Sequence, residues 1–255
     1  MTENPKYHFK PHELLTRLRP QQMGLDYTSV QRLELVEPVS LESVDEELCL
    51  VCLEGSFEFL HKHDRGKVVT KDMIYVPPQT GIVLTPEAYA VVMRFGAPST
   101  AKTQLKHIRF LDVNDDPVRH RSYGKAENNS LREVWHFIDD DFQSERFLVG
   151  ICKGAIGAWT AWPPHEHGAT REEVYTYFGM EEAFGIQCVY EDIDRPIQVA
   201  LVRDGDLVSV PRGYHPNVGC SGGRISYVYC MVSKTPWNRK FMDLTIHSIY
   251  GDRFE

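Results

Sequence analysis

The feature of this sequence that most constrains its fold is a series of short segments, rich in Val, Ile, Tyr and Phe, in which side chains tend to alternate between apolar and polar. A period of two is the pattern of a β-strand, because successive side chains point to opposite faces. Gly, Pro and Asp separate the segments, as turn residues do. Examples are ELCLVCLEGSFEFL, KDMIYVPPQTGIVL, EEVYTYF, DLVSVPRGYH and RISYVYCMVS. The sequence therefore predicts an all-β sandwich or barrel protein.

Helical patterns are sparse. KPHELLTRLR, residues 10–19, is the best candidate for a helix, and PWNRKFMDLTIHSIYG, residues 236–251, is a less regular one. We expect few, short helices.

The two halves of the chain resemble each other. DEELCLVCLEG matches REEVYTYFGM, which aligns Glu47 with Glu173, and KDMIYVPPQTGIV matches GDLVSVPRGYHPN, which aligns Asp72 with Asp206. Two copies of one strand–turn–strand unit predict a duplicated β-barrel.

The polar stretch 112–133 is interpreted as the linker between these copies. We therefore predict a first domain over residues 1–118 and a second over residues 119–255, and 255 residues suffice for two domains of ordinary size.

Charge and hydropathy exclude some classes of function. The net charge is −8, from 28 basic and 36 acidic residues, and no basic cluster of the kind that nucleic acids attract is present. No run approaches 18 consecutive apolar residues, so no membrane span is expected. The segment MTENPKYHFK lacks the apolar core of a secretory signal, which predicts a cytoplasmic protein.

Among the six cysteines, Cys49 and Cys52 have the spacing of a redox or zinc pair. Their segment reads as a strand, where positions i and i+3 point to opposite faces. We therefore interpret them as reduced core residues.

A polar constellation lies in the second half. His165 and His167 in PPHEHG share one face if the segment is extended, Glu173 begins the next strand, and His215 follows the tight turn PRGY. Three imidazoles and a carboxylate suit a divalent transition metal, and zinc, iron, manganese and nickel are all chemically suitable. Coordination positions would remain for water or substrate oxygens.

The first copy lacks these residues. Gly81 takes the place of His215, and Val39 and Leu41 take the places of the histidine pair. The first half does contain His61 and His63, spaced like the pair, but within a charged hairpin, and no histidine follows at the matching turn. We interpret these two as solvated surface residues.

At these positions the chain resembles the cupins, whose signature joins a histidine pair and a glutamate in one motif to a Pro–Gly turn and a third histidine in the next. It is still more similar to the 5-deoxy-glucuronate isomerases of bacterial myo-inositol catabolism. Those relatives read like SSYPPHKHD…EEIYYY…VRDGDVVLVPRGYHP where this chain has TAWPPHEHG…EEVYTYF…VRDGDLVSVPRGYHP. The chain departs at Glu166 and Gly168, where Lys and Asp are usual, which bears on the substrate more than on the metal.

The resemblance implies a bicupin: two cupin-type β-barrels, the first without metal ligands and the second binding metal. It implies an aldose–ketose isomerase that converts 5-deoxy-glucuronate to 2-deoxy-5-keto-gluconate. The related 4-deoxy-5-ketouronate isomerases of pectin breakdown carry zinc on three histidines and a glutamate. By that similarity the ligands are His165, His167, Glu173 and His215, and zinc is the expected metal.

Isomerisation also needs a base that moves a proton between neighbouring carbons. The candidates are Glu172, Tyr175, Tyr177 and Tyr190, and the sequence singles out none of them.

An anionic substrate on an acidic protein requires a local cation, for which a bidentate arginine fits best. Arg171, Arg203 and Arg212 lie nearest to the motifs.

An isomerase of a pectin-derived deoxy-ketouronate is one alternative, and alternatives from other classes also remain open. The same ligand set occurs in iron-dependent cupin dioxygenases, which would consume oxygen. A sugar-binding or regulatory protein could use the metal for structure alone. Relatives form homo-oligomers, so we expect one here, without a number of subunits.

Overall fold

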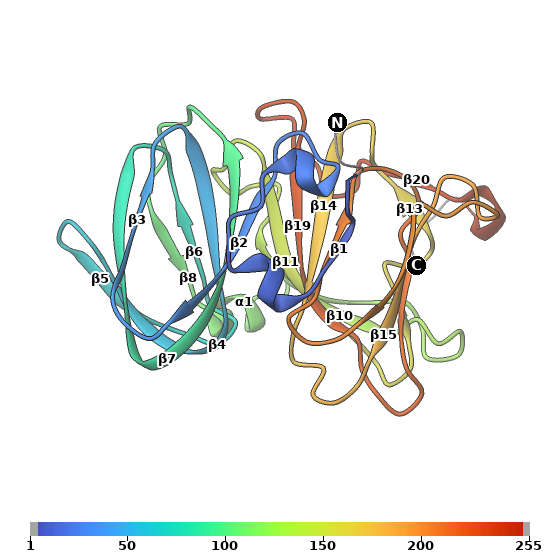
Figure 1. Cartoon of the computed structure of the whole chain (residues 1–255). Coiled ribbons are helices and arrows are strands. Elements are labelled where there is room, and N and C mark those ends of the chain that lie inside the picture. The colour runs from blue at the N-terminus through green and yellow to red at the C-terminus, as the bar shows by residue number, and fades with distance from the viewer. Residues whose placement is uncertain (1–4, 252–255) are drawn as a thin grey trace.

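The computed structural model describes residues 5–251, which fold into two β-barrels that lie side by side (Figure 1). The first barrel contains β2 (Ser29–Leu35), β3 (Val39–Ser43), β4 (Glu46–His61), β5 (Asp64–Val69), β6 (Met73–Val76), β7 (Thr80–Pro98) and β8 (Lys106–Ile108). Its pairing order is β2–β7–β4–β6–β8, with β3 also paired to β7 and β5 to β4, and all of these pairs are antiparallel.

The second barrel is built on another seven-stranded sheet, ordered β1–β17–β14–β19–β11–β10–β9. These strands are β1 (His8–Phe9), β9 (His120–Tyr123), β10 (Arg132–Ile138), β11 (Phe147–Gly154), β14 (Arg171–Tyr177), β17 (Leu207–Val210) and β19 (Ser226–Ser233). Smaller sheets complete it: β12 (Trp159–Thr160), β18 (Asn217–Gly219), β15 (Gly185–Val189) and β16 (Gln198–Val202) in one, and β13 (His165–Glu166) with β20 (Thr245–Ile246) in the other. The all-β prediction is confirmed.

Strand β4 shows how the cores are divided. Leu48 and Leu50 pack inside the first barrel, whereas Cys49 and Val51 point the other way, into a core shared by both barrels. Both faces of β4 are therefore buried over residues 46–53, and apolar residues occupy consecutive positions from Leu48 to Leu53 instead of alternating with polar ones. The shared core joins the two large sheets into one structure.

Register corrects the alignment of Glu47 with Glu173. In the first barrel Val76 of β6 pairs with Leu48, and at the corresponding place in the second barrel Val210 of β17 pairs with Glu173. The counterpart of Glu173 is therefore Leu48, and the sequence alignment was wrong by one residue. A slip of one position exchanges the two faces of a strand, so it matched a residue of the shared core with one inside a barrel.

By the same register, the counterpart of Glu47 is Glu172. Each of these two carboxylates accepts hydrogen bonds from backbone N–H groups of the other half of the chain. Glu172 accepts hydrogen bonds of 2.7–2.9 Å from the three backbone N–H groups of residues 26–28, just before β2. Glu47 accepts from the backbone N–H groups of Glu145 and Arg146, just before β11, at 3.0 and 2.7 Å. Each barrel thus holds the segment that leads into a strand of the other large sheet. We call these two contacts the carboxylate clasps.

The N-terminal strand crosses between the halves. His8 and Phe9 of β1 pair with Val208 and Leu207 of β17, so the first described strand of the chain belongs to the second sheet. The boundary predicted between residues 118 and 119 does not include this exchange, and as a boundary between folding units it stays a prediction.

The helix predicted at residues 10–19 is wrong in type and extent. The chain forms two short 3₁₀ helices, η1 (Pro11–Leu14) and η2 (Pro20–Met23), and between them Leu18 forms a bridge with Val30. Pro20 disfavours the α conformation in the residue before it, and a single turn or two of α-helix does not stabilise itself.

The helix predicted at residues 236–251 is also wrong. This segment contains β20 and a 3₁₀ turn, η3 (Ser248–Tyr250). Arg171 donates to the backbone carbonyls of Lys240 and Asp243, which holds the segment as a loop against the barrel. The sequence pattern could not reveal this distant partner.

The stretch 112–133 is only partly a linker. It includes the end of α1 (Phe110–Asn114) and all of β9, an edge strand paired with β10. An edge strand carries polar side chains on its exposed face, and this made the stretch read as a loop.

Cys49 and Cys52 are buried thiols on opposite faces of β4, as predicted, and neither is in a disulfide. Burial raises the pKa of the Cys52 thiol to about 12, which keeps it protonated and unreactive. Separately, no helix within residues 5–251 is long and apolar enough to cross a membrane.

Candidate metal centre

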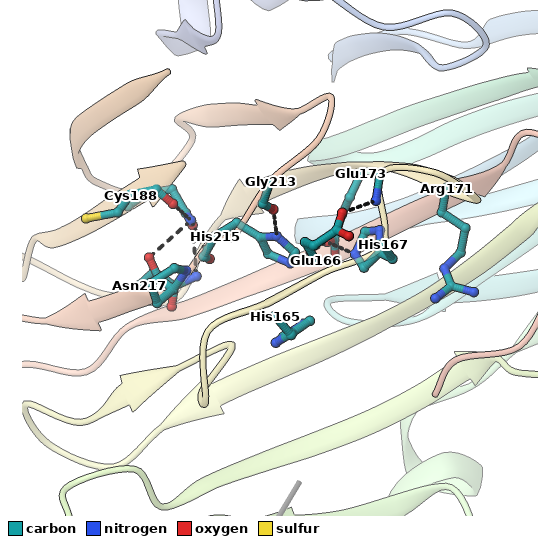
Figure 2. Close-up of polar contacts among 12 residues, drawn as sticks. His165, Glu166, His167, Arg171, Glu173, Cys188, Gly213, His215 and Asn217 are labelled. Carbon is teal, nitrogen blue, oxygen red and sulfur yellow. Dashed lines mark hydrogen bonds and ion pairs between the residues drawn. The ribbon is translucent and has the colours of Figure 1, made fainter. Parts of the chain in front are cut away.

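Three histidines converge inside the second barrel (Figure 2). His165 lies in β13, His167 two residues further along the extended segment, and His215 comes from the turn after β17. One ring nitrogen of each lies within 4.8 Å of the others, and all three residues are buried. Within residues 5–251 this is the only group of three such side chains that could hold a metal ion.

The turn before His215 needs a glycine. Gly213 has a φ of +88°, and a Cβ at this position would lie 2.6 Å from the carbonyl oxygen of Tyr190. Only glycine tolerates both the left-handed conformation and so close an approach. The PRGY turn can therefore bring His215 back towards the histidine pair.

Glu173 joins the group from β14. Its Oε2 lies 3.1 Å from Nε2 of His167 and 3.3 Å from Nε2 of His215. It faces the barrel interior together with Tyr175, whose side chain interacts with its carboxylate. The carboxylate and the imidazoles predicted from sequence thus form one cluster.

Hydrogen bonds orient two of the rings. Nδ1 of His165 lies 2.9 Å from the carbonyl oxygen of Pro163, and Nδ1 of His215 lies 2.8 Å from that of Gly213. A carbonyl oxygen only accepts, so each Nδ1 carries the proton and donates it. Each Nε2 is then left with a lone pair, and such a bond to the other ring nitrogen is what metal-binding histidines usually have.

The pKa values of these groups also favour neutral imidazoles. Burial lowers the pKa of His167 to about 3 and that of His215 to about 4, and it raises the pKa of the Glu173 carboxyl. The imidazoles are therefore neutral at pH 7, the form that binds metals. His167 Nδ1 and His215 Nε2 have no hydrogen-bond partner among the described residues, an expensive arrangement for buried nitrogens. This buried group of three histidines suits a divalent metal.

A pocket opens next to the cluster. Its walls come mainly from the inward faces of β10, β14 and β19, together with two residues of the C-terminal segment. The lining residues are Tyr123, Arg132, Val134, Cys152, Ala161, His165, His167, Glu173, Tyr175, Tyr227, Tyr229, Met231, Phe241 and Leu244.

Of the four residues predicted as candidate bases, the structure places only Tyr175 in this pocket. Glu172 points to the opposite face of β14 and is held in its clasp. The Tyr177 hydroxyl donates to Gln187 at 2.6 Å, and Tyr190 packs against Tyr214.

None of the three predicted arginines lines the pocket. Arg171, whose guanidinium points away from the histidines in Figure 2, is fully buried and donates to the carbonyl oxygens of Lys240 and Asp243.

The other two arginines lie on the surface. Arg203 is exposed in the turn before β17, at the end of that strand remote from His215. Arg212 is more than half exposed and pairs with Glu191 at 2.8 Å.

Sequence reasoning missed three polar residues near the cluster: Arg132, His136 and Tyr229. Arg132 and Tyr229 line the pocket, and His136 stands directly behind Tyr229. All three lie at inward-facing positions of β10 or β19, and the opposite faces of these strands are mainly apolar. Polar residues at alternate positions of an otherwise apolar strand are the signal that could have identified them.

The comparisons with known proteins agree with this architecture. Residues 3–249 match the KduI/IolB family. Curated relatives include a 5-deoxy-glucuronate isomerase of Geobacillus thermodenitrificans, 26% identical over 79% of this chain and 78% of that protein. Another, of Bacillus subtilis subsp. natto, is 27% identical over 92% of this chain and 90% of that protein.

Solved structures show the fold. An IolB-like protein of Salmonella typhimurium superposes with a TM-score of 0.80 at 23% identity, over 92% of this chain and 93% of that one. An oxalate decarboxylase of Bacillus subtilis superposes with a TM-score of 0.64 at 12% identity, over 91% and 78%. A cupin 2 conserved barrel protein of Leptotrichia buccalis has a TM-score of 0.54 at 10% identity, over 91% and 92%. The predicted cupin fold is confirmed, and the chain, an isomerase by its curated relatives, belongs to the KduI/IolB family.

Proposed function

We propose that this protein is a metal-dependent aldose–ketose isomerase that converts 5-deoxy-glucuronate to 2-deoxy-5-keto-gluconate in inositol catabolism. The observation that carries the proposal is the buried cluster of three histidines and Glu173 beside a pocket that also contains an arginine. The names of the curated relatives support the choice of substrate.

The proposed ligands are His165, His167, Glu173 and His215, and the proposed metal is zinc. When bound, a divalent metal would act as a Lewis acid on the oxygens of the reacting carbons. The chain contributes neutral imidazoles whose orientation is set by the carbonyls of Pro163 and Gly213. Its apolar surroundings strengthen electrostatic interactions at the site.

Arg132 is the proposed binding residue for the substrate carboxylate, in place of the arginines predicted from sequence. It is buried, it lines the pocket, and its guanidinium donates to the carbonyl oxygens of Ser130 and Trp162 at 3.0 and 2.6 Å. These bonds hold the planar group in one orientation, which reduces the entropy lost on binding an anion. Among the described residues, Arg132 is the only lysine or arginine that lines the pocket.

The experiment is turnover of 5-deoxy-glucuronate together with elemental analysis of the same purified sample. We expect about one metal ion per chain, with metal and turnover both lost in His165→Ala. Arg132→Gln should keep its metal and raise the KM for the uronate about 100-fold, because a charge-assisted contact to the carboxylate is lost.

Two results would contradict parts of the proposal separately. Bound metal without turnover would leave the metal centre standing and reject the substrate, and 4-deoxy-5-ketouronate from pectin would then be tested as the alternative. An unchanged KM in Arg132→Gln would remove that residue from carboxylate binding without affecting the metal ligands.

A further inference from the structure

Four tyrosines line the pocket: Tyr123, Tyr175, Tyr227 and Tyr229. The proposed isomerisation needs a group that takes a proton from one carbon and returns it to the next. A buried phenol can do this only if a second group exchanges protons with it, because burial raises the pKa of Tyr229, as it does those of Tyr175 and Tyr227. The four tyrosines therefore differ in whether their hydroxyl contacts a group that can exchange a proton with it.

Tyr229 has a nitrogen base behind it. Its hydroxyl lies 2.7 Å from Nδ1 of His136, whereas the Tyr123 hydroxyl lies 3.4 Å from Nε2 of the same ring. Tyr175 interacts with the proposed metal ligand Glu173, and Tyr227 with Cys152.

The contact between Tyr229 and His136 depends on a glycine between them. Gly150 of β11 pairs with His136 of β10 on one side and with Tyr229 of β19 on the other. A Cβ at this position would lie 2.3 Å from the Tyr229 hydroxyl oxygen. The absence of a side chain on the middle strand thus lets the phenol reach across to the imidazole.

The imidazole is enclosed and neutral. The Phe241 ring packs edge-on against it, with 4.6 Å between centroids. Burial, with smaller contributions from Arg121 and Arg119, lowers the pKa of His136 to about 4. In the neutral tautomer that carries its proton on Nε2, the nitrogen facing the Tyr123 hydroxyl, Nδ1 is unprotonated and accepts from the Tyr229 phenol, whose oxygen lone pairs remain available to the pocket.

We propose that Tyr229 is the catalytic acid–base of the isomerisation and that His136 is the positioning residue that exchanges protons with it. This inference rests on the proposed function and names the base that the sequence left open.

The step balances without a further reactant. The substrate C–H bond breaks, its proton goes to the Tyr229 oxygen, and the phenolic proton passes to Nδ1 of His136. The electron pair stays on the substrate as an enediolate, paired with an imidazolium. Within the enediolate the hydroxyl proton moves from one oxygen to the other, which exchanges the positions of the hydroxyl and the carbonyl. The reverse transfers then form a C–H bond at the neighbouring carbon and restore the neutral pair. Tyr229 is at no point a free tyrosinate, consistent with its buried position.

The test uses the metal-loaded full chain and two variants. Tyr229→Phe should lower kcat about 10²- to 10³-fold, with KM and metal content near those of the wild type. His136→Asn keeps an oxygen acceptor near the position of Nδ1 but cannot take up a proton, so kcat should fall by a similar factor. The double variant should lose little more than either single one, because the two residues act as a unit.

Isotope exchange separates catalysis from structure. In D₂O, exchange of the carbon-bound hydrogen of the substrate, followed by NMR, should slow in both variants in proportion to kcat. Tyr75→Phe is the matched control, because it removes a buried tyrosine hydroxyl, bonded to Glu47 at 2.7 Å, outside the pocket. It should leave kcat unchanged.

A kcat within threefold of the wild type in Tyr229→Phe would overturn the inference, as would full activity in His136→Asn, which would reduce the contact to a structural hydrogen bond. Both results require an active wild type and so leave the proposed function intact. A wild type that isomerises neither 5-deoxy-glucuronate nor 4-deoxy-5-ketouronate would overturn the inference and the proposed function together.

Discussion

The two barrels share a strand arrangement and differ in what they enclose. The first encloses apolar side chains, among them Leu48, Leu50, Phe57, Ile74, Ile82 and Leu84. The second encloses polar side chains, among them His136, His165, His167, Glu173, His215, Tyr175, Tyr227 and Tyr229. At the matched position of the central strand, Leu48 stands in one and Glu173 in the other.

This difference shows how one barrel can carry a costly site. Buried polar groups cost free energy unless they are paired, and two histidine nitrogens of the cluster lack a hydrogen-bond partner among the described residues. The interior of the first barrel is apolar. This barrel also contributes residues to the shared core and to the carboxylate clasps. The histidine–glutamate cluster and its pocket thus lie in one copy, and the other copy packs against it through the shared core.

The largest effect is expected from making the second barrel like the first. Glu173→Leu copies Leu48 and should abolish metal binding, with kcat/KM reduced about 10³-fold or more. Metal content and turnover measure the two effects. A variant that kept its metal would show that Glu173 is not a ligand.

The reverse exchange should damage the first barrel. Leu48→Glu places a carboxyl in the dry core and should cost about 3–5 kcal/mol of unfolding free energy, without creating a metal site. Leu60→Glu is the control, because Leu60 lies on the same strand and is 49% exposed. Its effect on urea unfolding should be within about 0.5 kcal/mol. Equal losses in the two variants would mean that the interior of the first barrel tolerates charge.

His136 makes the polar barrel sensitive to acid. Its pKa is about 4 in the folded protein and 6.5 in the reference state, so the unfolded chain binds more protons between these values. Stability therefore falls as the pH is lowered from 6.5 to 4, by up to about 3 kcal/mol from this residue. Unfolding free energies of wild type and His136→Asn, measured across that range, should differ in slope. Parallel curves would show that His136 does not titrate as described.

The smallest effect is expected from the other histidine pair. His61→Ala combined with His63→Ala should leave metal content and turnover unchanged. His61 Nδ1 contacts the carbonyl oxygen of Gly81 at 2.7 Å, and His63 is exposed. Loss of a metal ion from the double variant would reveal a second site and remove the proposed contrast between the barrels.

Much of the fold could be predicted because strand patterns are local. Alternation in EEVYTYF predicted that Glu173, Tyr175 and Tyr177 share a face, and all three point into the second barrel. The helix predicted at residues 236–251 is wrong because local pattern does not decide the conformation of this segment. Arg171, some 70 residues earlier in the chain, holds it as a loop. The clasps depend on similarly distant contacts, so the sequence alone does not distinguish Glu172 from a candidate base.

By itself, the sequence determined the all-β class, the duplication and the four residues of the histidine–glutamate cluster. Strand periodicity and the HxH, EE and PRGYH motifs are short-range patterns that can be read from neighbouring residues. Imidazole and carboxylate side chains are also recognisable as potential metal ligands from their type alone. Only the tertiary structure decided the register of the two copies, the roles of Glu47 and Glu172, and the placement of Arg132, His136 and Tyr229. Arg132, His136 and Tyr229 come together because β10, β11 and β19 lie side by side in one sheet, although β19 comes about 90 residues after β10 in the chain. Pairing between such distant strands depends on burial over the whole molecule, which no local pattern encodes.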